Sequence, residues 1–287
     1  IHPEETGMAT EYYLDNIDLK NGAKPLTAVC VPNGFKAGEK ASIILFLHGT
    51  GQTSIRDYFQ QTDHDLRPVL DGSNPVKQVI LIAPTLSPGA QGGILGGDEA
   101  DTVPSNALQG YLPLVSAELQ KKKPNPPIPE FDDPSKVGTI ILAAHSGGGK
   151  VMLALARTRG ADKYADKIAE CWGFDCLYGQ AHGSLSTPTS APDPKAPQPQ
   201  WTAWESKNKA HREMLWANWL RDNSGIEFYL YCASGPRGGG TTTRSTNLDK
   251  LAKRRNLTKA HLIFDASATH DGIIKPRFEE RLQALSV

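Results

Sequence analysis

Apolar residues gather along this chain in short continuous runs, such as residues 43–47 and 79–83. A strand with one face in water alternates apolar and polar residues, whereas an unbroken apolar run of strand length indicates burial on both faces. Such burial is typical of a parallel sheet covered by helices. The pattern predicts strands at residues 11–19, 26–31, 41–47, 78–83, 137–144, 167–174, 226–232 and 261–264.

Helical patterns fall between most of these strands, and this alternation favours one doubly wound α/β domain over two domains. We therefore predict that residues 1–287 form a single domain, with a mostly parallel central sheet of about eight strands and helices on both faces. The first two strands are an exception, because the Asn21-Gly22 dipeptide between them favours a tight antiparallel turn. The predicted helices are residues 54–61, 105–122, 149–157, 206–221, 246–255 and 276–285.

Two proline-rich stretches interrupt this rhythm. Residues 123–134 predict a surface loop, and residues 184–200 predict a longer connection without regular structure. Because long loops in compact domains are often functional lids, we interpret residues 180–221 as an inserted lid or cap segment. Trp204 and Trp216 within it are candidate substrate-binding residues. Packing of the lid on the core is an equal alternative for Trp216.

The overall charge excludes some classes of partner. Lysine plus arginine and aspartate plus glutamate each total 31, so the chain has no global positive field for nucleic acid or an anionic membrane surface. No apolar run approaches the roughly 20 residues that span a bilayer, so we expect no membrane span. The four cysteines match no paired zinc pattern and are too few for a disulfide scaffold, so free or partly paired core thiols are expected.

The first residue bears on the compartment. The sequence begins with Ile1, which indicates either a mature form after removal of a signal peptide or extra residues ahead of Met8. The compartment stays open, with a secreted or periplasmic location slightly favoured over the cytoplasm. The oligomeric state is likewise open.

A serine between small residues is the sharpest local signal. Residues 139–150 run from a β-branched strand into a glycine-rich helix start, with Ser146 at the corner between Ala144 and Gly148. A strand that turns into a helix within two residues strains its corner residue and leaves little room for nearby Cβ atoms. Such an elbow exposes the serine hydroxyl as a nucleophile, and the N–H of Gly147 can stabilise negative charge beside it.

A phosphate-binding loop is the competing interpretation of these glycines. The Walker pattern requires a glycine five places before Gly149 and a serine or threonine after Lys150. Ala144 and Val151 stand at those positions, so the spacing excludes this interpretation.

A second loop can complete an oxyanion site. The strand at residues 41–47 runs into His48-Gly49-Thr50-Gly51-Gln52, where backbone N–H groups can point at a neighbouring strand end. We expect Thr50 to supply the second donor, with Gly51 next. Gln52 on the same loop is a candidate substrate-binding residue.

Two further strand ends carry a candidate base and a candidate acid. His270 lies on a small-residue loop just past the last predicted strand, and Asp175 ends the strand that follows the elbow helix. The next strand end, residues 233–240, offers no carboxylate, which makes Asp175 the default acid. The alternatives left open are Asp265 and Asp271 for the acid and His182 for the base.

This ordered set of motifs resembles the α/β-hydrolase fold, specifically its serine esterase and lipase-like branches, from about residue 25 onward. The chain departs from the common pattern in two ways. Ala144 replaces glycine at the first elbow position, a variant found among lipase-like members. The family more often carries its acid one strand later than Asp175.

The resemblance implies hydrolysis of a small-molecule or polymeric carboxylic ester through an acyl-serine intermediate, with Ser146, Asp175 and His270 as the triad. These groups need no metal and no organic cofactor. An amidase or peptidase with the same triad is one alternative, and a non-catalytic binding protein on a hydrolase scaffold is another. His145, next to the nucleophile, is expected to pack beside the elbow, with contact to substrate as the alternative.

Overall fold

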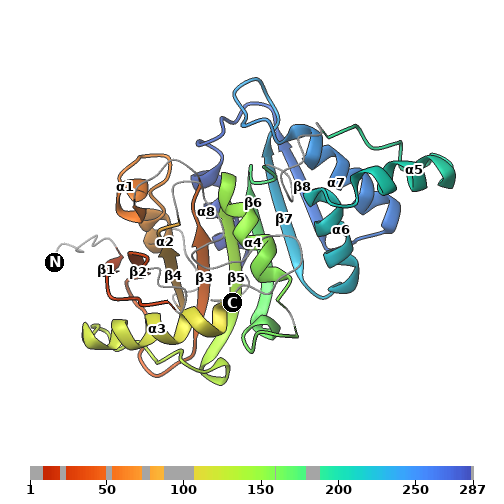
Figure 1. Ribbon diagram of the computed structural model, residues 1–287. Helices are drawn as coiled ribbons and strands as arrows, with labels where there is room; N and C mark the ends of the chain where they lie inside the picture. The colour runs from red at the N-terminus through yellow and green to blue at the C-terminus, as the bar shows by residue number, and fades with distance from the viewer. Residues whose placement is uncertain are drawn as a thin grey trace.

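Eight strands form one sheet in the order β1-β2-β4-β3-β5-β6-β7-β8 (Figure 1). The computed structural model describes residues 9–19, 24–49, 54–72, 78–86, 107–158, 160–178 and 188–285. All eight predicted strands are present, with ends shifted by up to five residues, since β1 ends at Leu14 and not at residue 19. Their bounds are β1 Thr10–Leu14, β2 Thr27–Val31, β3 Ala41–Leu47, β4 Val79–Pro84, β5 Val137–His145, β6 Ile168–Phe174, β7 Glu227–Ala233 and β8 Ala260–Asp265.

The neighbouring strands β4-β3-β5-β6-β7-β8 are all parallel, and the first two strands of the sheet, β1 and β2, are antiparallel. β1 pairs with β2, and β2 pairs with β4, in antiparallel register. The predicted antiparallel opening of the domain is confirmed, although the Asn21-Gly22 turn lies outside the described residues. Because the remaining strands are parallel, their carboxyl ends lie together at one end of the sheet, which we call the carboxyl edge or simply this edge. The strands that end there include β3, β5, β6, β7 and β8. Ligand sites in open α/β sheets form at this edge.

Helices cover both faces of the sheet, as predicted. Each face of the sheet has its own apolar core. Successive residues of β3 point to opposite faces, so Ile43 and Leu45 lie in one core and Ile44 and Phe46 in the other. Helices α3, α4, α6 and α7 contribute to the first core and α1, α2 and α8 to the second. The helices are α1 Ile55–Phe59, α2 Arg67–Gly72, α3 Leu108–Lys121, α4 Gly149–Ala156, α5 Gln198–Asn208, α6 Arg212–Asp222, α7 Thr242–Arg255 and α8 Ile274–Ala284, with 3-10 turns at Pro134–Lys136, Ser146–Gly148 and Ala165–Lys167.

Two predictions about helices were wrong in detail, and one helix was missed. Helix α2 was not predicted, and α5 begins inside the stretch expected to lack regular structure, where Pro199 fits the first helical turn. The helix predicted over residues 206–221 is two helices. The side-chain amide of Asn208 donates to the carbonyl oxygen of Trp204 at 2.7 Å, and this local bond accompanies the end of α5.

The segment 180–221 connects β6 to β7, and its described part begins at residue 188. Helix α6 packs against α7 (Figure 1). The carboxylate of Glu213 on α6 is fully buried and lies 2.9 Å from the guanidinium of Arg244 on α7. Helix α6 therefore serves as the crossover helix between the parallel strands β6 and β7.

Two further expectations concern the whole chain. All four cysteines are buried free thiols. Among the described residues, no helix is long and apolar enough to cross a membrane.

Candidate active site

The turn from β5 into α4 has the strained geometry that the sequence predicts. Ser146 follows the last residue of β5 and has a φ of +51°, in the left-handed backbone region that residues other than glycine rarely adopt. A 3-10 turn over Ser146–Gly148 leads directly into α4. Strain of this kind is common at functional sites.

Close backbone approach explains the small residues around this serine. A Cβ atom on Gly148 would lie 2.1 Å from the carbonyl oxygen of Leu47, so only glycine fits there. A Cβ atom on Gly49 would lie 3.3 Å from the hydroxyl oxygen of Ser146. The first residues after β3 therefore lie directly against the elbow, where a second oxyanion donor was expected.

His48 anchors the start of that loop. The backbone N–H of Leu86 donates to Nε2 of His48 at 2.8 Å, which leaves the Nδ1 proton for the carbonyl oxygen of Gly49, 2.6 Å away. Burial lowers the pKa of His48 to about 4, so the ring is neutral at pH 7. This ring ties the loop after β3 to the end of β4. Thr50, Gly51 and Gln52 lie outside the described residues.

Asp175 is fully buried at the end of β6 and has a φ of +43°. The backbone N–H of Gly239 donates to its Oδ2 at 2.8 Å, and the hydroxyl of Thr241 donates to its Oδ1. Both donors belong to the loop after β7, the strand end that carries no carboxylate of its own. That loop therefore supplies the hydrogen bonds that a buried carboxylate requires.

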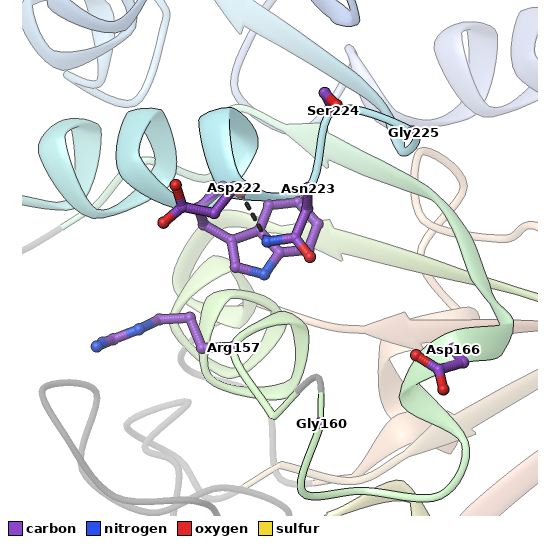
Figure 2. A pocket seen from close by; sticks show the side chains of 8 residues that line it. Arg157, Gly160, Asp166, Asp222, Asn223, Ser224 and Gly225 are labelled. Carbon is purple, nitrogen blue, oxygen red and sulfur yellow. Dashed lines mark hydrogen bonds between the residues drawn. The ribbon is translucent and has the colours of Figure 1, made fainter.

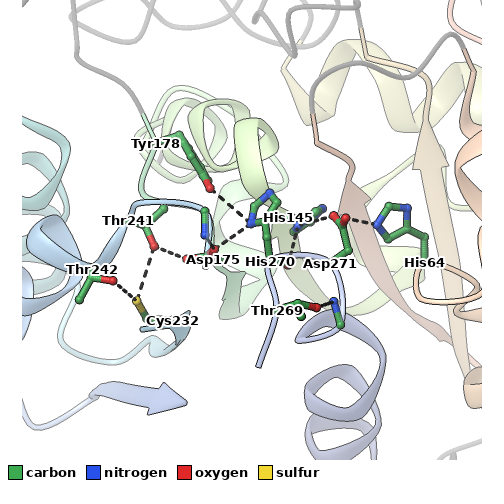
Figure 3. Close-up of polar contacts among 12 residues, drawn as sticks. His64, His145, Asp175, Tyr178, Cys232, Thr241, Thr242, Thr269, His270 and Asp271 are labelled. Carbon is green, nitrogen blue, oxygen red and sulfur yellow. Dashed lines mark hydrogen bonds and ion pairs between the residues drawn. The ribbon is translucent and has the colours of Figure 1, made fainter. Parts of the chain in front are cut away.

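His270 lies beside this carboxylate, with its Nδ1 2.7 Å from Oδ2 of Asp175 (Figure 3). The hydroxyl oxygen of Tyr178 lies 3.3 Å from the same nitrogen. The backbone N–H of His270 donates to the carbonyl oxygen of Arg237 at 3.0 Å, which holds the loop after β8 in place. The structure thus brings Asp175 and His270 together at the sheet edge that carries Ser146.

The other carboxylates near His270 have different partners. Asp265 accepts hydrogen bonds from Ser267 and Arg277, and these lower its pKa to about 2. The Oδ1 atom of Asp271 lies 3.2 Å from Nε2 of His64. Of the three candidate acids, only Asp175 contacts the imidazole of His270 among the described residues. His182 lies outside them.

His145 is buried beside the elbow, as expected, and contacts the loop that carries His270. Its ring centroid lies 4.5 Å from that of His270, and its Nε2 lies 3.2 Å from the carbonyl oxygen of His270. Its Nδ1 lies 2.9 Å from the hydroxyl oxygen of Tyr58. Burial lowers the pKa of His145 well below the ordinary value, so the ring is neutral at pH 7. A substrate contact by His145 stays a prediction.

Sequence reasoning missed several groups around this edge. Tyr58, His64 and Tyr178 come from three separate loops or helices, and no local motif marks any of them. Gly239 and Thr241 belong to a glycine-rich stretch whose only sequence signal was its lack of a carboxylate. In the structure this loop donates hydrogen bonds to Asp175 through N–H and O–H groups, and it does not supply the acid itself.

The two tryptophans proposed for substrate binding lie in the core. Trp216 is fully buried, and its ring centroid lies 4.7 Å from that of Phe228 on β7. Trp204 packs edge-on against Trp201 and donates its ring N–H to the carbonyl oxygen of Thr189 at 3.1 Å. These contacts favour the packing alternative.

Replacing Trp216 by alanine is therefore expected to lower the free energy of unfolding by about 3–5 kcal/mol, the usual cost of removing a large buried ring. Denaturant unfolding measures this loss. Phe264→Ala is the control, because Phe264 is 39% exposed and its loss should cost much less. A stable Trp216→Ala protein with altered substrate preference would return Trp216 to the substrate site.

A separate hollow of about 620 Å³ lies at the opposite edge of the sheet (Figure 2). It adjoins the amino ends of β6 and β7, since Asp166 precedes β6 and Gly225 precedes β7. It is therefore distinct from the edge that carries Ser146. Its lining consists of Arg157, Gly160, Asp166, Trp219, Asp222, Asn223, Ser224 and Gly225.

Comparison with solved structures supports the fold. The chain matches the feruloyl esterase module from Clostridium thermocellum with a TM-score of 0.58 and 12% identity, over 96% of this chain and 87% of that module. It matches Thermogutta terrifontis esterase 2 with a TM-score of 0.54 and 13% identity, over 97% and 94% of the two chains. An S-formylglutathione hydrolase from Agrobacterium tumefaciens matches with a TM-score of 0.51 and 14% identity, over 97% of each chain.

The sequence itself matches no protein-family model and no curated protein. At such low identities the structural matches establish the fold and not the activity. The chain has the α/β-hydrolase fold, and the three solved structures compared above are two esterases and an S-formylglutathione hydrolase.

Proposed function

We propose that this protein is a serine hydrolase that cleaves a carboxylic ester through an acyl-serine intermediate. The observation that carries the proposal is the 2.7 Å contact between Asp175 and His270, at the same sheet edge as the strained Ser146. The resemblance to solved esterase structures supports the choice of reaction.

The proposed roles follow from the chemistry of acyl transfer. A serine hydroxyl is a weak nucleophile, so an imidazole must accept its proton during attack on the ester carbonyl. With Nδ1 of His270 held by Asp175, Nε2 is the ring nitrogen available for this proton. The carboxylate then stabilises the imidazolium that forms. The same imidazolium returns its proton to the leaving alcohol, and water attacks the acyl-serine in a second, equivalent cycle.

The oxyanion of each tetrahedral intermediate requires N–H donors. Gly147 is buried at the start of the helical turn, where the backbone N–H groups and the helix dipole favour negative charge. We assign the second donor to Thr50 or Gly51, because Gly49 already lies against Ser146. Gln52 on that loop is assigned to substrate binding.

A panel of esters tests the proposal. p-Nitrophenyl esters of increasing acyl length should be hydrolysed, and methyl ferulate belongs in the panel because one of the similar structures is a feruloyl esterase. An aryl amide run beside them separates an esterase from an amidase with the same triad. Absence of hydrolysis across the whole panel, together with reversible binding of one of its members, would favour the alternative of a binding protein on this scaffold.

A further inference from the structure

Two buried histidines and one carboxylate meet beside His270 without taking part in the proposed reaction (Figure 3). They are His64 after α1, His145 at the end of β5 and Asp271 after β8. Nε2 of His64 lies 3.2 Å from Oδ1 of Asp271, and Nε2 of His145 lies 3.9 Å from the same oxygen. One ligand atom from each of the three residues lies within 4.8 Å of the others.

His64 is the group in this cluster that lacks an explanation. Its side chain is only 4% exposed, and neither ring nitrogen makes a hydrogen bond among the described residues. Oδ1 of Asp271 lies 3.2 Å from Nε2 of His64, so the carboxylate is the one group at that nitrogen among the described residues, and Nδ1 has no hydrogen-bond partner there. Burying a polar group without such a partner costs about 1–3 kcal/mol, so natural proteins rarely leave one unsatisfied. The ring stacks on Tyr58 at 4.2 Å, which fixes its plane but satisfies neither nitrogen.

We propose that His64, His145 and Asp271 form a binding site for a divalent transition-metal ion such as Zn²⁺, and that the bound ion inhibits hydrolysis. The first half stands on the geometry of the cluster alone. The second half rests on the function proposed above, because it requires His270 to act as the base.

The spacing of the cluster suits such an ion. Zn²⁺ binds imidazole nitrogen and carboxylate oxygen at about 2.0–2.2 Å, so the ligand atoms of a tetrahedral site lie about 3.3 Å apart. The observed 3.2 Å and 3.9 Å are close to this value. Two imidazoles also favour zinc, copper or nickel over the hard cations Mg²⁺ and Ca²⁺. The side chain of Asp271 is 55% exposed, which gives an ion a route from solvent.

Binding requires a change of tautomer at His145. In the free protein, Nε2–H can donate to the carbonyl oxygen of His270, and the Tyr58 hydroxyl can donate to Nδ1. For metal ligation the ring proton moves to Nδ1, where it is donated to the hydroxyl oxygen of Tyr58. The ring stays neutral and Nε2 presents a lone pair. Such a second partner on the other ring nitrogen is usual for histidine ligands of metals.

The same change explains why the ion should inhibit. The contact from His145 to the carbonyl oxygen of His270 is lost, so the loop that carries His270 loses one of its supports. The rings of His145 and His270 also lie 4.5 Å apart, so the metal site directly adjoins the proposed base.

Binding is tested with Co²⁺ as a visible-light probe, since it takes the same ligands as Zn²⁺ and absorbs when bound. The wild-type protein should bind one Co²⁺ per chain in a saturable titration. His64→Gln and Asp271→Asn should each weaken binding at least tenfold, with thermal melting used to confirm that both variants fold. His261→Gln is the matched control, because His261 also pairs with a carboxylate, Glu227, but lies outside the cluster. It should bind Co²⁺ as the wild type does.

Inhibition is tested separately by titrating Zn²⁺ into the ester assay. At saturation, kcat/KM should fall at least tenfold for the wild type and for His261→Gln, while His64→Gln should stay active. Wild-type Co²⁺ affinity in either cluster variant, or no saturable binding at all, would overturn the site. Binding without loss of kcat/KM would overturn its inhibitory role. Co²⁺ binding by a protein that hydrolyses no ester would leave the site standing and remove the proposed function instead.

Discussion

Replacing Ser146 by alanine is expected to lower kcat for ester hydrolysis by about a million-fold, the loss seen when the nucleophile of a serine hydrolase is removed. The substitution deletes only the hydroxyl oxygen that forms the acyl intermediate. Alanine occupies the same left-handed backbone conformation at a steric cost similar to that of serine, so the elbow and the fold should persist.

Labelling identifies the nucleophile independently of turnover. Treatment with a fluorophosphonate followed by peptide mapping should place the adduct on Ser146 and leave Ser146→Ala unlabelled. Ser234→Ala is a suitable control, because Ser234 follows β7 at the same sheet edge. An adduct on Ser234 or Ser184, with Ser146→Ala fully active, would refute the assignment.

The strands could be predicted from the sequence because their signal is local. In β3 and β4 every apolar residue is buried on one face or the other, so the unbroken runs directly report the two-sided burial. The antiparallel pairing of β1 with β2 was also predicted, from the Asn21-Gly22 dipeptide, which lies outside the described residues.

Helix boundaries were less predictable because side chains compete for the backbone. Asn208 bonds the carbonyl oxygen of Trp204 where the periodic pattern of apolar residues would have continued one helix. The short helix α2 presents only Val69 and Leu70 to the core, too few positions for a periodic signal.

In the candidate site, too, some residues could be predicted from the sequence and others could not. Ser146, Asp175 and His270 each end or follow a predicted strand, so the parallel topology alone brings them to one edge. The groups that hold them there come from distant segments: Gly239 lies 64 residues from Asp175, and Tyr58 lies 87 residues from His145. No spacing rule in a single sequence connects such pairs, because their contact depends on how loops at the edge fold over one another.

Asp175→Asn is expected to lower kcat for ester hydrolysis by about ten-thousand-fold. The acid is the member of the proposed triad with the most alternatives, since Asp265 and Asp271 also lie near His270 in the sequence. Asparagine keeps the shape of aspartate and tolerates the positive φ at this position, so the backbone should be undisturbed. It cannot stabilise an imidazolium, and its NH₂ group must face Gly239, Thr241 or His270, each of which now donates to a carboxylate oxygen.

Steady-state kinetics on three purified variants measures the effect against matched controls. Asp265→Asn and Asp271→Asn make the same chemical change closer in sequence to His270, but their carboxylates contact Arg277 and His64 instead of the His270 ring. Each should therefore cost kcat far less than Asp175→Asn. A small loss at Asp175 with a collapse at Asp271 would move the acid next to the histidine. The bonds from Gly239 and Thr241 to Asp175 would then be structural supports of the loop after β7.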